Sequence, residues 1–184
     1  MNNVPDLVTE PISTLQAREF RVRRASTRDI PAIQELTVPL VERRILLGKD
    51  QVAFYEAVQE FRVAVDTDNR IIGCGALHVL WEDLGEVRTL AVTEPWLGRG
   101  VGRALVQRLE SDARGLGLQR LFCLTFEVRF FERNGFADMG SETVDPAVYA
   151  ELLRSNDEGI AEFLDLARVK PNTLGNTRMI KHLR

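Results

Sequence analysis

The spacing of hydrophobic residues along the chain changes between a period of two and a period of three to four, and each change predicts a new element. Residues 20–23 alternate hydrophobic and basic side chains, which predicts a first strand. The run Ser26-Thr27-Arg28-Asp29 before Pro31 is a helix-start signal, and we expect Pro39 to disturb the end of that helix. Asp50 caps a second expected helix, whose hydrophobic stripe consists of Phe54, Val58 and Phe61.

The middle of the chain predicts a hairpin, a central strand and an amphipathic helix. Residues 61–65 and 71–80 are hydrophobic runs joined by a polar turn, so we expect them to pair in an antiparallel hairpin. Residues 86–92 form the next expected strand. The helix that follows carries hydrophobic side chains at positions 101, 105 and 109 on one face and ends at Gly115 or Gly117.

The last third predicts a strand at 120–125, a short helix at 128–134 that Gly135 stops, a helix at 145–154 and a tail, 169–183, suited to an edge strand. The order β-α-α-β-β-β-α-β-α-β predicts an α/β (mixed α+β) fold, a central mixed sheet of about six to seven strands with helices on both faces. Residues 1–18 lack periodicity and are expected to form a mobile N-terminal leader. The single domain then occupies residues 19–184.

Composition narrows the classes of function. A chain of 184 residues with 45% hydrophobic and 28% charged residues suits one domain with its own core. With a net charge of −3, the chain has no excess of basic residues that would indicate binding to nucleic acid. No hydrophobic run reaches the roughly 18 residues of a membrane span. We expect a cytoplasmic protein with a small-molecule partner, no nucleic acid and no membrane, and a homodimer is left open. Cys74 and Cys123 lack metal-ligand spacing, so we expect buried core residues and no metal.

Glycines occupy three alternate positions, Gly98, Gly100 and Gly102, between the central strand and the amphipathic helix. Glycine lets a backbone approach a ligand closely, and the free N–H groups that begin a helix favour a phosphate group. The segment therefore predicts a pyrophosphate site, with a tight turn that binds nothing as the alternative. It has neither the lysine of a P-loop nor the spacing of a dinucleotide fingerprint.

The segment Leu97-Gly98-Arg99-Gly100-Val101-Gly102, together with the preceding Leu90-Ala91-Val92, resembles the acetyl-CoA signature of the GNAT family of N-acetyltransferases. Leu97 stands where the family has Arg or Gln, which removes one side-chain contact and leaves the backbone donors. The resemblance implies the GNAT acyltransferase fold and acetyl-CoA as cosubstrate. It places cofactor binding at Leu90, Ala91, Val92, Leu97, Gly98, Arg99, Gly100, Val101, Gly102 and Arg103.

Four further stretches, 38–49, 72–77, 121–125 and 130–136, resemble the acetyltransferase domain of N-acetylglutamate synthases in order and spacing. The resemblance covers residues 20–137. It implies direct attack of the α-amino group of L-glutamate on the thioester of acetyl-CoA, the first step of arginine biosynthesis. Many such synthases carry an amino-acid-kinase domain in front, so this chain resembles the short standalone actinobacterial type, and arginine feedback is not assumed.

The resemblance implies catalytic roles for Glu86 and Thr125. In the family the matching Glu accepts the ammonium proton through water, because an amine must be neutral to attack. A structural Glu paired with Arg88 is the alternative. Many acetyltransferases use a Tyr in the short helix, where this chain has Phe130-Phe131. Thr125 matches a Ser or Thr that protonates the leaving thiolate, with capping of the next helix as the alternative.

Substrate binding is assigned to Leu47, Lys49, Arg88, Thr89, Thr177 and Arg178. Lys49 matches a basic residue of the family's glutamate site, with a solvated loop lysine as the alternative. Leu47 and Thr89 match residues that contribute backbone contacts. Thr177 matches a Ser of the family's carboxylate clamp, but Gly175 stands where the family has Arg, so Arg178 or Lys170 would have to compensate. Glutamine, aspartate, another small amine or a peptide N-terminus therefore stay open as acceptors, as does a catalytically silent acyl-CoA-binding module.

Overall fold

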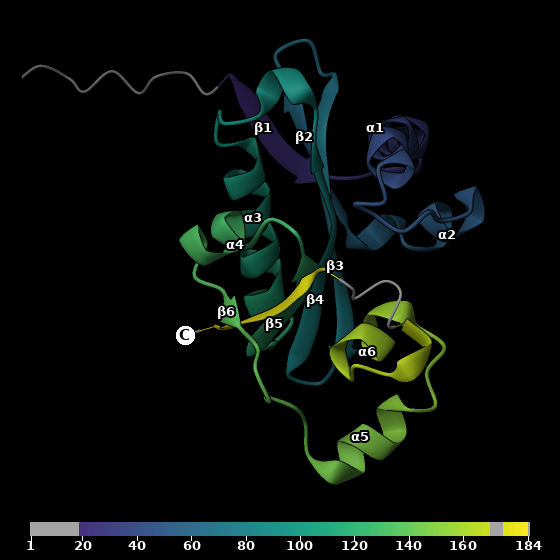
Figure 1. The fold of residues 1–184 in the computed structure, drawn as a ribbon. Helices are drawn as coiled ribbons and strands as arrows, with labels where there is room; N and C mark the ends of the chain where they lie inside the picture. The colour runs from purple at the N-terminus through teal and green to yellow at the C-terminus, as the bar shows by residue number, and fades with distance from the viewer. Residues whose placement is uncertain (1–18, 170–174, 184) are drawn as a thin grey trace, which may run out of the picture.

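The protein, in a computed structural model that describes residues 19–169 and 175–183, contains one seven-stranded sheet in the order β1-β2-β3-β4-β5-β7-β6 (Figure 1). The strands are β1 (Phe20–Arg24), β2 (Phe61–Asp66), β3 (Ile71–Trp81), β4 (Leu84–Val92), β5 (Arg120–Thr125), β6 (Ala137–Asp138) and β7 (Thr177–His182). Neighbouring strands run antiparallel except for β4 and β5, which are parallel. The predicted mixed sheet is confirmed.

Helices cover both faces of this sheet, as predicted (Figure 1). They are α1 (Ile30–Glu42), α2 (Gln51–Glu56), α3 (Val101–Gly115), α4 (Val128–Arg133), α5 (Pro146–Leu152) and α6 (Glu158–Phe163). One face packs its buried residues against α3 and α4, while α1 and α2 cover part of the other face and α5 and α6 cover the rest. Because side chains alternate along a strand, Leu84, Glu86 and Arg88 of β4 share the face of α6, and Val87 faces α3.

The sheet opens in its middle. β4 and β5 pair only from Leu84 to Glu86 against Arg120 to Phe122, although β4 continues to Val92 and β5 to Thr125. Beyond the paired region Thr89 has a left-handed backbone (φ 55°), and the register of β4 against β3 shifts there. The two strands therefore diverge, and the second half of β4 turns one edge of its backbone toward the opening.

Two predictions, one for the C-terminal tail and one for the second helix, are wrong. The tail does not form an edge strand, because β7 lies between β5 and β6. Met179 and Ile180 are both buried on opposite faces of the sheet, as an interior strand requires. The second helix does not extend along Phe54, Val58 and Phe61: α2 ends at Glu56, and Phe61 is the first residue of β2.

Other predicted features agree with the structure. α3 ends at Gly115, with Gly117 in the left-handed conformation just beyond (φ 86°). Pro39 lies inside α1, which continues three residues past it to Glu42, so the proline does not end the helix where it occurs. Both cysteines are buried. Among the elements that the sequence predicted, β6 and α6 were missing, and the predicted order also omitted the helix at 145–154, which is α5. The N-terminal leader lies outside the described residues, and the extent of the domain over 19–184 stays a prediction.

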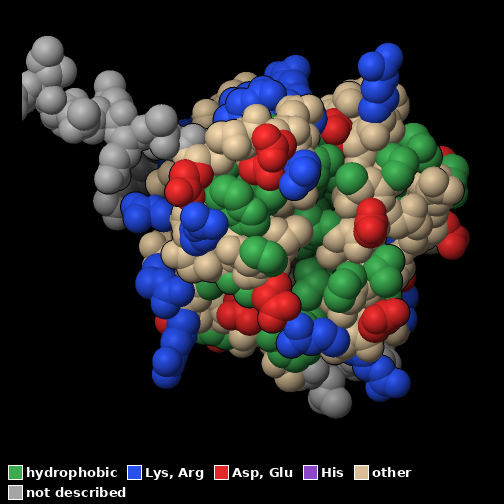
Figure 2. All heavy atoms as spheres, turned by 90° about the horizontal axis from the view of Figure 1, so that it is seen from above, with side chains coloured by type: hydrophobic (Ala, Val, Ile, Leu, Met, Phe, Trp, Pro, Cys, Tyr) green, Lys and Arg blue, Asp and Glu red, His purple; other side chains and the backbone are tan. Residues whose placement is uncertain are grey.

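The described part of the chain contains no helix long and hydrophobic enough to cross a membrane. Figure 2 shows acidic, basic and hydrophobic side chains intermingled on one face of the molecule.

Candidate active site

A cavity of about 580 Å³ lies where β4 and β5 diverge. Its wall comes from the end of α1 and the following loop, the middle of β4, the end of β5, the start of α4, α6 and Asn176. The structure brings together in this wall the predicted residues Leu47, Lys49, Glu86, Arg88, Thr89, Leu90 and Thr125. Since Phe131 packs on the α3 face while Glu162 belongs to α6, the cavity reaches through the opening from one face of the sheet to the other.

Glu86 is a carboxylate held in the sheet interior, with 4% of the residue exposed. Its Oε2 has no hydrogen-bond partner, and the nearest cation, Nη1 of Arg88, is 3.7 Å away. Burial raises the pKa of Glu86 to about 7, and the charge of Asp157 adds to this rise, while the charge of Arg88 opposes it. Glu86 therefore has the pKa of a group that accepts and returns a proton near neutral pH.

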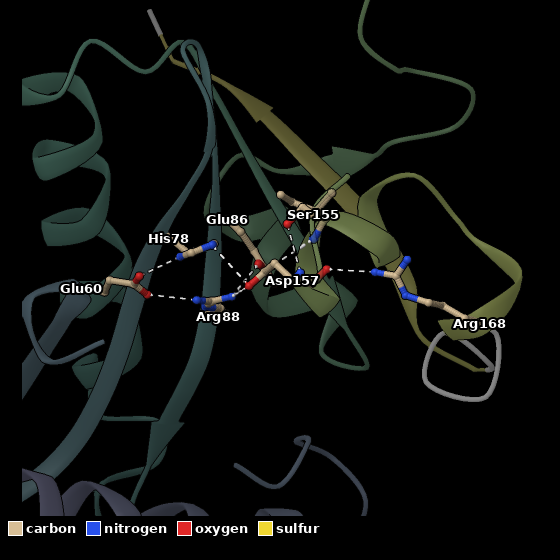
Figure 3. Close-up of polar contacts among 8 residues, drawn as sticks. Glu60, His78, Glu86, Arg88, Ser155, Asp157 and Arg168 are labelled. Carbon is tan, nitrogen blue, oxygen red and sulfur yellow. Dashed lines mark hydrogen bonds and ion pairs between the residues drawn. The ribbon is translucent and has the colours of Figure 1, made fainter. Parts of the chain in front are cut away.

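Four further residues form a charged network beside Glu86 on the same face (Figure 3). Nη1 of Arg88 donates to Oδ2 of Asp157 at 2.9 Å, and its Nη2 donates to Oε2 of Glu60 at 3.2 Å. His78 lies between the same two carboxylates, with Nδ1 2.7 Å from Glu60 and Nε2 3.4 Å from Asp157. Arg88 lines the cavity, but Glu60 and Asp157 bind its guanidinium, so it does not hydrogen bond Glu86.

Lys49 reaches the cavity from the loop between α1 and α2 and is partly buried. Burial lowers the pKa of its ammonium group, and the nearby charge of Arg88 lowers it further. This environment differs from that of a fully solvated loop lysine. Leu47 precedes it on the same loop and stays 47% exposed.

Thr125 ends β5 in the cavity wall with 8% of the residue exposed. Its Oγ1 accepts a hydrogen bond of 2.9 Å from the backbone N–H of Glu127, the residue before α4. This bond forms a turn before α4 and does not cap the helix, because Glu127 is the N-cap residue and α4 has no side-chain cap. A hydroxyl that accepts one bond still has its own O–H to donate, so the turn is compatible with proton donation.

The glycine loop, residues 97–103, lies at the N-terminus of α3. Gly98 and Gly100 have left-handed backbones (φ 73° and 84°), and a Cβ at either position would enter open space. A Cβ at Gly102 would lie 3.2 Å from the ring of Phe130, which lines the cavity. The loop therefore adjoins the cavity through Phe130, with Leu97, Arg99 and Arg103 exposed. Ala91 and Val92 continue β4 toward the loop.

Two predicted substrate residues do not line the cavity. Thr177 pairs with Thr125 across β5 and β7. Nη1 of Arg178 donates to the backbone oxygen of Phe163 at 2.9 Å, which attaches α6 to β7. The neighbouring Asn176 lines the cavity instead.

Sequence reasoning missed the residues of the site that come from α6 and from the charged network: Glu60, His78, Asp157, Glu158, Gly159 and Glu162. One signal was available. Asp157 accepts a hydrogen bond from the N–H of Ile160 and so caps α6, and an Asp at that spacing before a hydrophobic run indicates a helix start. Within the described ranges, no three His, Cys, Asp or Glu side chains are grouped so that they could hold a metal ion.

Comparison with known proteins identifies the class of protein to which this split mixed sheet, glycine loop and cavity belong. The chain belongs to the acetyltransferase (GNAT) family, whose model matches residues 30–136, and it is therefore an acetyltransferase enzyme.

Among individual relatives, the chain is 55% identical over 161 residues to the amino-acid acetyltransferase of Mycobacterium tuberculosis, covering 86% of this chain and 92% of that protein. It is 37% identical to the amino-acid acetyltransferase of Pseudomonas putida, but it spans only 30% of that relative's length.

Similar solved structures include the following two. Rv2747 of Mycobacterium tuberculosis, in complex with CoA and NLQ, has a TM-score of 0.83 and 53% identity, covering 89% of this chain and 99% of that one. N-acetylglutamate synthase of Neisseria gonorrhoeae, complexed with coenzyme A and N-acetyl-glutamate, has a TM-score of 0.69 and 26% identity, covering 90% of this chain and 35% of that one.

Proposed function

We propose that this protein is an amino-acid N-acetyltransferase that transfers acetyl from acetyl-CoA to the α-amino group of L-glutamate, the first step of arginine biosynthesis. The observation that carries the proposal is a buried carboxylate of raised pKa, Glu86, in the same cavity wall as the partly buried cation Lys49. The likeness to curated amino-acid acetyltransferases, and to a synthase complexed with coenzyme A and N-acetyl-glutamate, supports both substrates.

The cosubstrate site follows from the glycine loop and the opening of the sheet. The first N–H groups of the 15-residue helix α3 favour the pyrophosphate of acetyl-CoA, and the left-handed Gly98 and Gly100 let it approach. The backbone of β4 beyond Glu86 turns N–H groups toward the opening, where they bind the thioester carbonyl and stabilise the oxyanion of the tetrahedral intermediate.

Glu86 and Thr125 carry the two proton transfers. The substrate ammonium gives a proton to Glu86, directly or through one water, and the neutral amine attacks the thioester carbon. As the C–S bond breaks, the hydroxyl of Thr125 donates its proton to the sulfur, and the second proton that the nitrogen loses on forming the amide returns to the Thr125 oxygen. The products are the N-acetyl amino acid, CoA with a free thiol, and one proton that Glu86 returns to solvent. Lys49 binds a carboxylate of the amino acid as a point charge.

A second candidate is acetylation of a neutral amino acid such as glutamine. The cavity wall carries four carboxylates, Glu86, Glu127, Glu158 and Glu162, against three cations, Arg44, Lys49 and Arg88. This charge balance suits an acceptor with one carboxylate better than one with two.

An assay with a panel of acceptors distinguishes these candidate functions. Release of the CoA thiol is measured with glutamate, glutamine, aspartate and a small amine without a carboxylate. We expect the highest kcat/KM for glutamate. A tenfold preference for glutamine would establish the second candidate, and no thiol release with any acceptor would leave a module that binds acyl-CoA without turnover. Location in the cytoplasm and a homodimer stay predictions from the sequence.

A further inference from the structure

We propose that Glu162 is a second carboxylate of the acceptor site, which binds the substrate ammonium together with Glu86 and holds it for deprotonation. The inference rests on the proposed function, because it adds a residue for the same amine. It applies to any amino acid or amine that enters this cavity as an ammonium ion.

The packing of α6 on β4 brings the two carboxylates into one wall. At Gly159 the helix lies so close to β4 that a Cβ there would overlap Oε2 of Glu86, and only a glycine permits this approach. Glu162 follows three residues later, on the same side of the helix. It is 6% exposed and lines the same cavity as Glu86.

The cations near Glu86 and Glu162 do not balance the charge of both carboxylates. Oε2 of Glu86 has no hydrogen-bond partner, and Arg88, the nearest cation, is bound by Glu60 and Asp157. Burial raises the pKa of Glu162 to about 7, and the charge of Glu86 contributes to that rise. The ionisable groups around the pair in the cavity wall or beside it are Lys49 and Arg44 from the loop after α1, His78 from β3, Arg88 from β4, Cys123 from β5, Glu127 from the turn after β5, and Asp157 and Glu158 at the start of α6.

An ammonium ion between the two carboxylates supplies the missing positive charge and favours the ionised form of both. One N–H bond of the ammonium then breaks as an O–H bond forms on Glu86. The nitrogen lone pair becomes free to attack the thioester carbon. Glu162 stays ionised and keeps a hydrogen bond to a remaining N–H, which fixes the direction of the lone pair.

The test compares Glu162→Gln with the control Glu151→Gln. Gln keeps the shape of the Glu162 side chain and removes its charge. Glu151 is an exposed glutamate on α5, paired with Arg154 and outside the cavity wall, so its variant removes an equal charge at a distance. Kinetics are measured with the acceptor that the parent enzyme uses best, and calorimetric binding of that amino acid is measured without turnover.

We expect Glu162→Gln to raise both KM and Kd for the amino acid at least tenfold, with KM for acetyl-CoA within twofold of the parent. The acid limb of the kcat/KM profile should move to lower pH, because loss of a neighbouring negative charge lowers the pKa of Glu86. Glu162→Asp should recover part of the affinity. Unchanged Kd and an unshifted acid limb in a folded Glu162→Gln variant would overturn the proposal. A parent that binds the amino acid but releases no thiol would refute the proposed function alone, since Kd still reports on Glu162.

Discussion

Replacing Glu86 with Gln should remove catalysis and stabilise the protein at the same time. Gln cannot accept the ammonium proton, so kcat/KM should fall by about 10²–10⁴, the usual contribution of a general base. The stability effect has a separate cause. Glu86 is buried and its Oε2 lacks a hydrogen bond, so the native state holds the ionised carboxylate at a cost that a neutral amide avoids.

The size of this effect follows from the pKa of Glu86, which rises from 4.5 to about 7 on folding. Because the native pKa lies above the unfolded value, the native state binds more protons between these two pH values, and stability falls as pH rises through that window. The buried carboxylate therefore lowers the free energy of unfolding by about 3 kcal/mol at pH 8 and by less than about 1 kcal/mol at pH 5. Glu86→Gln should therefore raise Tm by up to roughly 6–12 °C at pH 8, and by much less at pH 5.

Thermal and urea unfolding of parent and variant at both pH values measure this difference. Glu110→Gln is the matched control, because Glu110 is also buried but binds Nζ of Lys181 at 2.5 Å. That variant should lose stability at pH 8, since it leaves the Lys181 ammonium without its carboxylate. If Glu86→Gln is also destabilising at pH 8, Glu86 is a structural partner of Arg88, and the assignment of the base is wrong.

The remaining predictions concern the substrates. Lys49→Ala should cost one charge-assisted hydrogen bond of about 1.5–3 kcal/mol, which raises KM for glutamate roughly ten- to hundredfold and leaves acetyl-CoA kinetics unchanged; a KM within twofold would make Lys49 a surface residue. Thr125→Ala should lower kcat more than either KM, and Thr125→Ser should retain activity; kcat within twofold would assign the acid to water. Gly102→Val should raise KM for acetyl-CoA, because the valine side chain would press against Phe130 and displace the backbone that we expect to bind the pyrophosphate. Unchanged acetyl-CoA kinetics in a folded variant would contradict the cofactor assignment.

The cofactor half of the site was predictable because its signals are local in the sequence. The glycines at 98, 100 and 102 follow directly after β4, and two of them need the left-handed backbone that their spacing suggested. Hydrophobic alternation and the helical period likewise placed β4 and α3 within two residues of their observed bounds. The predicted boundaries were wrong where a strand begins a few residues after a helix ends, as at Phe61. A single buried side chain there fits the spacing of a helix and the spacing of a strand equally well.

The charged network was not predictable, because its members meet only after folding. Arg88 binds Asp157 from 69 positions away and Glu60 from 28 positions away. The capping pattern marks Asp157 as a helix start and the family resemblance marks Arg88, but no local pattern shows that these two residues and Glu60 meet. The same holds for Gly159, whose lack of a side chain matters only because Glu86 lies against it.

The connection between β6 and β7 explains why the acceptor half of the site depends on such distant residues. β6 and β7 are antiparallel neighbours, which a short turn could join. The chain between them runs instead through α5 and α6, on the face that α1 and α2 only partly cover, before β7 pairs with β5 (Figure 1). This long connection puts α6, with Gly159 and Glu162, over Glu86. The helix that the sequence analysis did not predict, α6, therefore supplies part of the wall of the acceptor site.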